Sequence, residues 1–304
     1  MKRTPLNKRK TTQRKPKKPT MVASTRKSKK KQGKSFLKTL KYVVLLSVTV
    51  VILAVGYHYR NGVLYYLGFT TSKNIDTLTK EERKIADLRI YDIVGRHSDK
   101  IFGIDVSHYQ GEINWKELQQ AEEQFPLHFI FIRATAGKDK TDTKFAENWK
   151  RSKQNGYLRG AYHYYRPDEN SMAQANNFIA TVKLAEGDLP PVLDIERLPN
   201  KQSMDSLKIG LQRWLDRVEA HYDVAPIIYS GESFYTDFLK EEFSDYKLWI
   251  ANYSFFKDRI RDEWLFWQFT DKAQIKGING NVDVNIYNGN LEELTGMLIL
   301  DSGN

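Results

Sequence analysis

The stretch Leu189-Pro190-Pro191-Val192-Leu193-Asp194-Ile195-Glu196 has the composition of a short buried strand. A strand tolerates proline at its start but not in its middle, so the strand is expected to begin near Val192. The apolar residues that follow are typical of a strand covered on both faces. Because side chains alternate along a strand, Asp194 and Glu196 point the same way, with Cα atoms roughly 6–7 Å apart.

Two acidic side chains this close change each other's protonation. The charge of one raises the pKa of the other, which leaves one acid protonated and one ionised near neutral pH. A proton donor beside an anion is the arrangement that cleaves a glycosidic bond. A solvated strand end or a helix N-cap is the simpler interpretation of an isolated Asp-x-Glu, so the rest of the sequence has to distinguish the two.

Basic residues are concentrated at one end of the chain of 304 residues. Residues 1–41 contain 17 Lys and Arg and no Asp or Glu, whereas the remainder carries 31 basic and 37 acidic residues. Few apolar residues occur before Phe36, so we expect residues 1–41 to be a disordered basic tail. The tail could bind anionic lipid or nucleic acid, but beside an apolar segment it is better explained as a determinant of membrane topology.

Residues 42–59 (YVVLLSVTVVILAVGYHY) contain no Lys, Arg, Asp or Glu. A helix of this length spans about 27 Å, close to the ~30 Å hydrocarbon core of a bilayer. A buried core helix is disfavoured because the run has no polar face, and a signal peptide cleaved near Gly56 is disfavoured by the long basic lead. We therefore expect a transmembrane helix embedded in the lipid bilayer. Positive charge stays inside, so the N-terminus should be cytoplasmic and the later chain should face the periplasm or cell wall.

The remaining chain separates into a predicted stalk, a domain and a tail. Residues 60–99 are expected to form a juxtamembrane stalk, in which Thr79 and Glu82 have capping-box spacing. Residues 100–293 alternate short apolar stretches with amphipathic stretches of helical length, which indicates a parallel α/β sheet. Residues 294–304 are expected to be a C-terminal tail.

Eight strands and five helices are predicted in residues 100–293. The strands are Ile101–Val106, His128–Thr135, Arg159–Tyr165, Val192–Glu196, Ala225–Ser230, Lys247–Ala251, Leu265–Thr270 and Val282–Ile286. The helices are Trp115–Gln124, Lys144–Asn155, Ser171–Leu184, Ser203–Tyr222 and Ser233–Leu239. This count predicts an incomplete (β/α) TIM-like barrel whose later strands lack helices. A doubly wound open sheet is the alternative.

Acidic residues recur at the strand ends where barrel enzymes place their sites. Asp105 in the first strand, Asp194 and Glu196 in the fourth, and Asp283 in the last are expected to converge on one rim. Aromatic residues at comparable positions suit the apolar faces of sugar rings, with core packing as the alternative for each: Tyr162, Tyr164, Tyr229, Trp249, Tyr253 and Trp267. For Trp214, on a predicted helix, we expect core packing.

The segment 103–111 (GIDVSHYQG), followed by Ile113-Asn114-Trp115, resembles the opening motif of the family 25 glycoside hydrolases, which are lysozymes called muramidases. Further motifs follow in the family's order: 131–137 (FIRATAG), 160–164 (GAYHY), 189–196 (LPPVLDIE), 228–230 (IYS), 248–253 (LWIANY), 267–269 (WQF) and 282–285 (VDVN). The resemblance covers about residues 101–290. It implies an incomplete (β/α) barrel and hydrolysis of the β-1,4 bond between N-acetylmuramic acid and N-acetylglucosamine in peptidoglycan glycan strands.

The resemblance also implies roles for individual residues. Glu196 would be the general acid, and Asp194 would stabilise positive charge at C1 by orienting the substrate's acetamido group. Asp105 and Asp283 would tune this pair electrostatically. The positions that would bind substrate are Tyr164, Tyr229, Trp249, Gln268 and Arg133.

One residue departs from the family's pattern. Ala136 stands where the family usually has Glu, which puts the local hydrogen bonding at that rim in doubt. A catalytically inactive wall-binding module is therefore the alternative function.

Other kinds of site lack support in the sequence. No cysteine is present and the six histidines show no H-x-x-x-H spacing, so no metal site is expected, although His108 and His163 fall near the rim. No nucleotide-binding glycine motif occurs. We expect no cofactor and no nucleic-acid partner.

Overall fold

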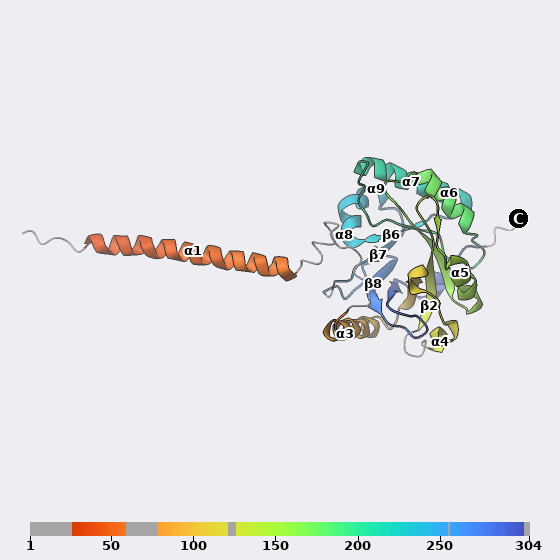
Figure 1. The fold of residues 1–304 in the computed structure, drawn as a ribbon, viewed down its shortest axis with the longest axis horizontal. Helices are drawn as coiled ribbons and strands as arrows, with labels where there is room; N and C mark the ends of the chain where they lie inside the picture. Colours follow the sequence, from red (N-terminus) through yellow and green to blue (C-terminus); the bar gives the residue numbers. More distant parts are fainter. Residues whose placement is uncertain (1–25, 59–77, 121–125, 255, 301–304) are drawn as a thin grey trace, which may run out of the picture. The chain divides into compact units, whose positions relative to one another are not determined.

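The computed structural model describes residues 26–58, 78–120, 126–254 and 256–300, and the chain divides into two compact units, residues 1–73 and 74–304 (Figure 1). In the first unit, helix α1 runs over Arg26–His58. It therefore begins inside the segment that we expected to be disordered, because Lys, Arg, Gln and Leu favour helix. Residues 1–25 lie outside the described residues.

Helix α1 includes most of the predicted membrane span. The apolar side chains of residues 42–55 are exposed along it. Within the described ranges, no helix is both long and apolar enough to cross a membrane. The side chains of residues 56–58 and the whole of residue 59, which complete the predicted span, are outside those ranges.

The second unit is built on a closed barrel of eight strands. Around the ring the strands follow the order β1-β9-β8-β7-β6-β5-β4-β2, and a pairing between β1 and β2 closes it. The strands are β1 Ile101–Val106, β2 Leu127–Ala136, β4 Leu158–Tyr164, β5 Val192–Asp194, β6 Ile227–Gly231, β7 Leu248–Ala251, β8 Phe266–Ala273 and β9 Val282–Tyr287, and the short β3 Lys140–Thr141 pairs with the end of β2. The predicted barrel is confirmed, and the open-sheet alternative is excluded.

One strand runs against the predicted direction. Strand β9 is antiparallel to both of its neighbours, β8 and β1, whereas the other ring pairs are parallel. The cause is the connection, because residues 274–281 are fewer than the roughly dozen residues that a parallel crossover needs. The N-terminal end of β9 therefore lies at the rim formed by the C-terminal ends of the other strands.

Helices cover the outside of the earlier strands and are missing later, as predicted (Figure 1). They are α4 Trp115–Gln120, α5 Phe145–Gln154, α6 Ser171–Thr181 and α7 Met204–Tyr222, then a helical stretch of α8 Glu232–Phe234, the π-helical turn Tyr235–Leu239 and α9 Lys240–Phe243, and finally α10 Leu291–Thr295. In the described residues between β7 and β9 no helix occurs.

The barrel interior is filled by alternate strand residues. Phe129 and Phe131 of β2 lie inside, together with Leu294 of α10. Gly103 and Gly160 make room for them, because a Cβ atom at either position would lie 2.3 Å from a phenylalanine ring. Since Leu294 is fully buried and the backbones of 187–188 and 299 exchange hydrogen bonds, residues 294–300 belong to the domain and are not a free tail.

Helix α3, Lys80–Arg96, also belongs to the domain, although we expected this region to be part of a stalk. Its predicted capping box is confirmed, with Thr79 and Glu82 hydrogen-bonded to each other's backbone N–H groups. Ile93 is 1% exposed and lies in the core. Arg83 donates to the Lys272 carbonyl at 2.6 Å, which ties the helix to β8.

Candidate active site

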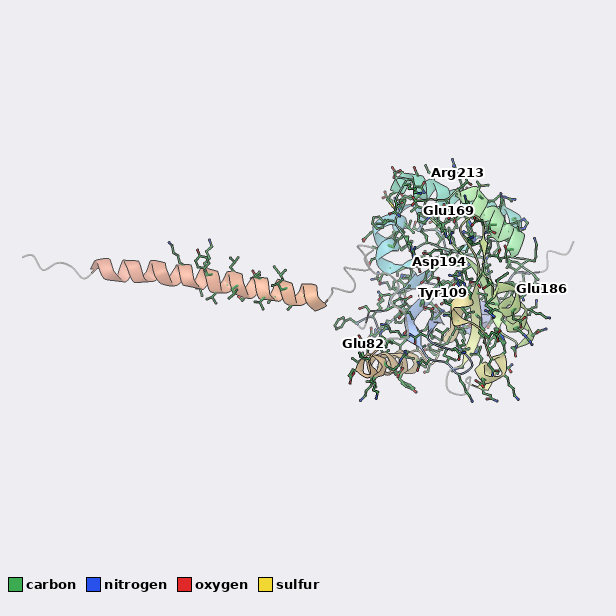
Figure 2. The ribbon with its side chains drawn as sticks, in the orientation of Figure 1. Glu82, Tyr109, Glu169, Glu186, Asp194 and Arg213 are labelled. Atoms are coloured by element: carbon green, nitrogen blue, oxygen red, sulfur yellow. The ribbon has the colours of Figure 1, made fainter. Side chains whose placement is uncertain are left out.

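The period-two alternation of the strands brings the four predicted acids to one rim of the barrel. Asp194 continues the inward-facing row that starts with Val192 on β5, and Glu196 follows two residues later. Asp105 and Asp283 are paired across β1 and β9. Asp194 is 5% exposed. In the view of Figure 2 it lies near the middle of the second unit, whereas Glu186 and Arg213 lie at its outline.

Asp105 is buried and accepts two hydrogen bonds from neutral amides. The Nε2 of Gln268 and the Nδ2 of Asn285 donate to its Oδ2 at 2.7 and 2.8 Å. Burial raises the pKa of Asp105 to about 6, the two hydrogen bonds oppose this, and the nearby charge of Glu196 adds to it.

Asp194 carries an oxygen that is buried and unpaired. Its Oδ1 has no hydrogen-bond partner among the described residues, and Asp194 as a whole is only 5% exposed. Burial raises the pKa of Asp194 well above its ordinary value, and the charges of Glu196 and Asp105 raise it further. The site therefore holds an acceptor that is desolvated but not satisfied by the protein.

Glu196 and Asp283 are partly buried and belong to the same electrostatic cluster. Burial raises the pKa of Glu196, and the Tyr229 hydroxyl nearby opposes this shift. Burial also raises the pKa of Asp283 well above its usual range, with Asp105 as the next cause. Buried acids that lie close together and have raised pKa values are candidates for general acid catalysis.

Three of the residues predicted to bind substrate form the floor beneath these acids. Trp249 is 2% exposed, Tyr229 6% and Gln268 2%. The Nε1 of Trp249 donates to Asn285 Oδ1 at 2.8 Å, and the Tyr229 hydroxyl donates to Gln268 Oε1 at 2.7 Å. For Trp249 this burial favours the core-packing alternative. Tyr164 remains partly exposed, with the Arg197 guanidinium 5.6 Å from its ring centre.

Asn285 belongs to the site, although the sequence analysis did not single it out. It links Asp105 to Trp249 through its two amide atoms. Its spacing of two residues from Asp283 on a strand was the signal, because residues i and i+2 face the same side.

Comparisons with known proteins agree with this geometry. The family model of glycosyl hydrolases family 25 matches residues 104–278. The chain belongs to this family. It is 42% identical over 202 residues to the uncharacterized protein YegX of Escherichia coli O6:H1, covering 65% of this chain and 73% of YegX. It is 31% identical over 207 residues to lysozyme M1 of Streptomyces globisporus, covering 63% of this chain and 69% of that protein.

Solved structures of the family share the fold. The bacterial lysozyme of Streptomyces coelicolor superimposes with a TM-score of 0.59 at 28% identity, covering 65% of this chain and 96% of that one. A family 25 glycosyl hydrolase of Bacillus anthracis gives the same TM-score and identity, covering 66% and 94% of the two chains.

In this glycosyl hydrolase the turn that contains Ala136 is held by other residues. Gly137 has a φ of 62°, and its N–H donates to the Tyr164 carbonyl at 3.0 Å. The carboxylate of Glu169 accepts from the Lys138 N–H at 2.7 Å. The local hydrogen bonding that Ala136 put in doubt is therefore made, with a glutamate from the loop after β4 at its centre.

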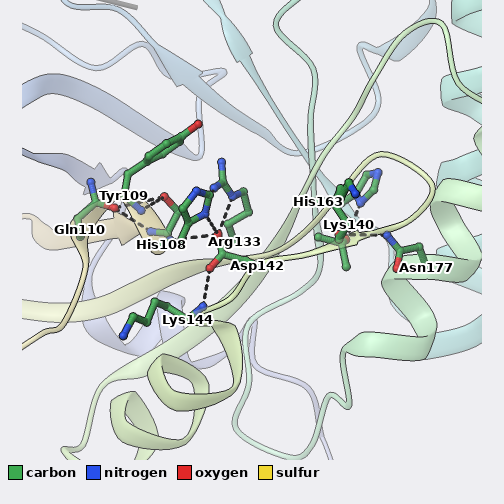
Figure 3. Close-up of polar contacts among 11 residues, drawn as sticks. His108, Tyr109, Gln110, Arg133, Lys140, Asp142, Lys144, His163 and Asn177 are labelled. Atoms are coloured by element: carbon green, nitrogen blue, oxygen red, sulfur yellow. Dashed lines mark hydrogen bonds and ion pairs between the residues drawn. The ribbon is translucent and has the colours of Figure 1, made fainter. Parts of the chain in front are cut away.

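Arg133 at the end of β2 is fixed by a buried aspartate (Figure 3). Its Nε donates to Asp142 Oδ2 at 2.9 Å, and the His108 Nδ1 lies 2.7 Å from the same oxygen. Burial alone would raise the pKa of Asp142, but hydrogen bonds from His108 and the Lys144 N–H hold it below its usual range. An ionised Asp142 thus orients Arg133, whose charge lowers the pKa values of Asp194 and Glu196.

His163 lies under the rim and cannot act there. It is fully buried, Thr135 Oγ1 lies 2.6 Å from its Nδ1, and its ring stacks on Trp214. Burial lowers the pKa of His163 to about 3, so the ring is neutral. Trp214 lies in the core, as predicted. Among the described residues, no group of three or more His, Asp or Glu side chains could hold a metal ion.

Proposed function

We propose that this family 25 glycosyl hydrolase is a muramidase, which cleaves the β-1,4 bond between N-acetylmuramic acid and N-acetylglucosamine in peptidoglycan. The observation that carries the proposal is the Asp194–Glu196 pair on one strand end, with raised pKa values for both acids. Lysozyme M1, a relative at 31% identity, supports the choice of substrate.

In the proposed reaction, Glu196 donates its proton to the leaving glycosidic oxygen. Burial favours the protonated form of Glu196, which keeps the donor loaded at higher pH than an exposed glutamate. Asp194 faces the positive charge that develops at C1. Its unpaired Oδ1 is suited to accept the N–H of the substrate's acetamido group, which would then be held as the internal nucleophile.

Asp105 and Asp283 complete the site from the neighbouring strands. Both are held by β1 and β9 rather than by loops, which fixes their positions relative to Asp194. An ionised carboxylate at either position favours a cationic transition state, and the charge of Asp105 raises the pKa values of both Asp194 and Asp283. We propose for them an electrostatic role rather than the proton transfer itself.

The test is mass analysis of the products that the full chain releases from purified peptidoglycan. Muropeptides with N-acetylmuramic acid at the reducing end are expected. Glu196→Gln should abolish release, whereas the matched control Glu186→Gln, which changes an exposed glutamate at the periphery, should not. Turnover by Glu196→Gln at the wild-type rate would contradict the assignment.

A catalytically inactive wall-binding module is the second candidate, and Ala136 is the residue that motivates it. It predicts retention of the chain on insoluble peptidoglycan without release of any product. The intact turn around Gly137 and the presence of all four acids favour the enzyme.

For the location we propose that residues 42–59 anchor the chain in the cell membrane, with residues 1–41 cytoplasmic and the barrel facing the periplasm or cell wall. The proposal rests on the uncharged run of residues 42–59 beside a basic segment, and on the exposed apolar side chains of residues 42–55. Carbonate extraction of membranes tests it. The full chain should stay in the pellet, and a variant that lacks residues 42–59 should be soluble. A full chain released by carbonate would contradict the anchor.

A further inference from the structure

Tyr109 is an exposed aromatic residue at the same rim, and the proposed reaction leaves it without a role. It lies in the short helical turn His108–Gln110 after β1 and is 76% exposed. Single exposed aromatic residues are common and need no explanation by themselves. A role for Tyr109 therefore depends on the side chains that surround it.

Two neighbouring side chains, those of His108 and Arg133, contact the Tyr109 ring (Figure 3). The His108 ring lies 4.3 Å from it between centres, and the Arg133 guanidinium carbon lies 4.9 Å from the centre of the Tyr109 ring. Its backbone N–H donates to Ser107 Oγ at 3.3 Å inside a capping box. Because Asp142 fixes both His108 and Arg133, the ring is presented to solvent on a rigid support.

The same support connects Tyr109 to the catalytic acids. Arg133 contacts the Tyr109 ring, and its charge acts on both Asp194 and Glu196. Around the barrel, β1 is three strands from β5, by way of β2 and β4. At about 4.8 Å per strand this is on the order of 14 Å along the rim, which is longer than one pyranose ring.

We propose that Tyr109 is a stacking platform for an N-acetylhexosamine ring of the glycan strand that lies beyond the ring attacked at Asp194. The inference rests on the proposed function, and it adds a subsite to it. The apolar face of a sugar ring buries its C–H groups against the exposed face of the tyrosine. Trp249 and Tyr229 cannot serve in this way, since they are 2% and 6% exposed. In this arrangement Asp142 is a positioning residue, which holds Arg133 behind the platform.

The test compares Tyr109→Ala and Tyr109→Phe in the full chain, with long purified glycan strands as substrate. Tyr109→Ala should raise KM about tenfold and leave kcat within about twofold, because the lost contact is the same in ground and transition states. A tenfold change corresponds to about 1.4 kcal/mol. Tyr109→Phe should behave like the wild type, since it keeps the ring face.

The matched control is Tyr91→Ala, because Tyr91 of α3 is 78% exposed and lies on a different element. An unchanged KM in Tyr109→Ala, or an equal rise in Tyr91→Ala, would overturn the platform. If Tyr109→Ala has a lower melting temperature than the wild type, Tyr109→Gln replaces it in the test. Glutamine removes the ring but keeps a long side chain, and the same rise in KM is expected.

If the protein is not a muramidase, the experiment gives a result that differs from failure of the stacking platform. In that case the wild type releases no product, and co-sedimentation with insoluble peptidoglycan replaces kinetics. Tyr109→Ala should then be retained about tenfold more weakly than Tyr91→Ala. Equal retention of the two variants would overturn the platform independently of catalysis.

Discussion

Asp105 and Asp283 occupy directly opposed positions on the antiparallel strands β1 and β9. Like charges placed opposite each other are destabilising. The chain accepts this arrangement by keeping the pKa values of both carboxyls raised and by giving Asp105 hydrogen bonds from two neutral amides. The repulsion is relieved when one of the two carboxyls is protonated, so the pair lowers the stability of the fold only at pH values where both are ionised.

The first prediction is that Asp105→Asn stabilises the protein at pH 7 and removes its activity. The folded-state pKa of Asp105 is about 6 against an ordinary value of 3.8. The folded state then binds more protons between about pH 4 and 6, so the free energy of unfolding falls as the pH rises through this window. Asparagine keeps an acceptor for Gln268 and Asn285 and does not titrate. Its unfolding free energy at pH 7 should exceed that of the wild type by about 1–3 kcal/mol.

Chemical denaturation at pH 3 and at pH 7 measures this difference. At pH 3 the Asp105 carboxyl and the amide that replaces it are both neutral, so the two proteins should have similar free energies of unfolding. A variant that is less stable than the wild type at both values would show that burial and repulsion do not set the pKa of Asp105.

The second prediction concerns the alkaline limb of the activity profile. In the proposed reaction Glu196 acts in its protonated form, so activity should be lost as the pH rises through its pKa. The charge of Arg133 lowers the pKa of Glu196. Arg133→Gln should therefore move the alkaline limb to higher pH, whereas Arg133→Lys, which keeps the charge, should leave it close to the wild type. Initial rates across pH with soluble glycan test this, and a limb that moves downward in Arg133→Gln contradicts it.

The third prediction is that Asp142→Ala is strongly destabilising. Its side chain is 1% exposed and accepts from Arg133, from the His108 N–H and from the Lys144 N–H. Removing the carboxylate leaves buried donors unsatisfied, which costs about 2–4 kcal/mol. The control is Glu112→Ala. The Glu112 side chain pairs with Lys144 and is 91% exposed, so its removal should change the free energy of unfolding by less than about 0.5 kcal/mol. Urea unfolding of the two variants makes the comparison, and equal effects would exclude a special role for Asp142.

The fourth prediction tests whether α3 is part of the folded domain. Ile93 is 1% exposed, whereas Ile85 on the same helix is 55% exposed. Ile93→Ala should lower the free energy of unfolding by about 2–4 kcal/mol through lost burial and the cavity left behind. Ile85→Ala should lie within about 0.5 kcal/mol of the wild type. A stalk that does not pack on the barrel would give two small effects of equal size.

The sequence by itself determined the strand positions and the pairing of the two acids Asp194 and Glu196. Strands were recognisable because a short apolar run between turn residues rarely forms anything other than a buried strand. The predicted bounds of β1, Ile101–Val106, agree with the structure at both ends. The common direction of Asp194 and Glu196 followed from the period of two, which is a local property of the backbone. The motifs of the family then predicted the barrel and the four acids at its rim.

Only the tertiary structure decided what depends on contacts between distant segments. The packing of α3 and the burial of Trp249 depend on contacts across more than 30 residues of chain. The place of β9 in the ring depends in the same way on its pairing with β1, at the other end of the domain. A local pattern cannot distinguish an aromatic residue that lines a groove from one that packs beneath it, because both occupy the same face of a strand. The cluster of His108, Arg133 and Asp142 was hidden for the same reason: three segments supply it, and only the closed barrel brings them together.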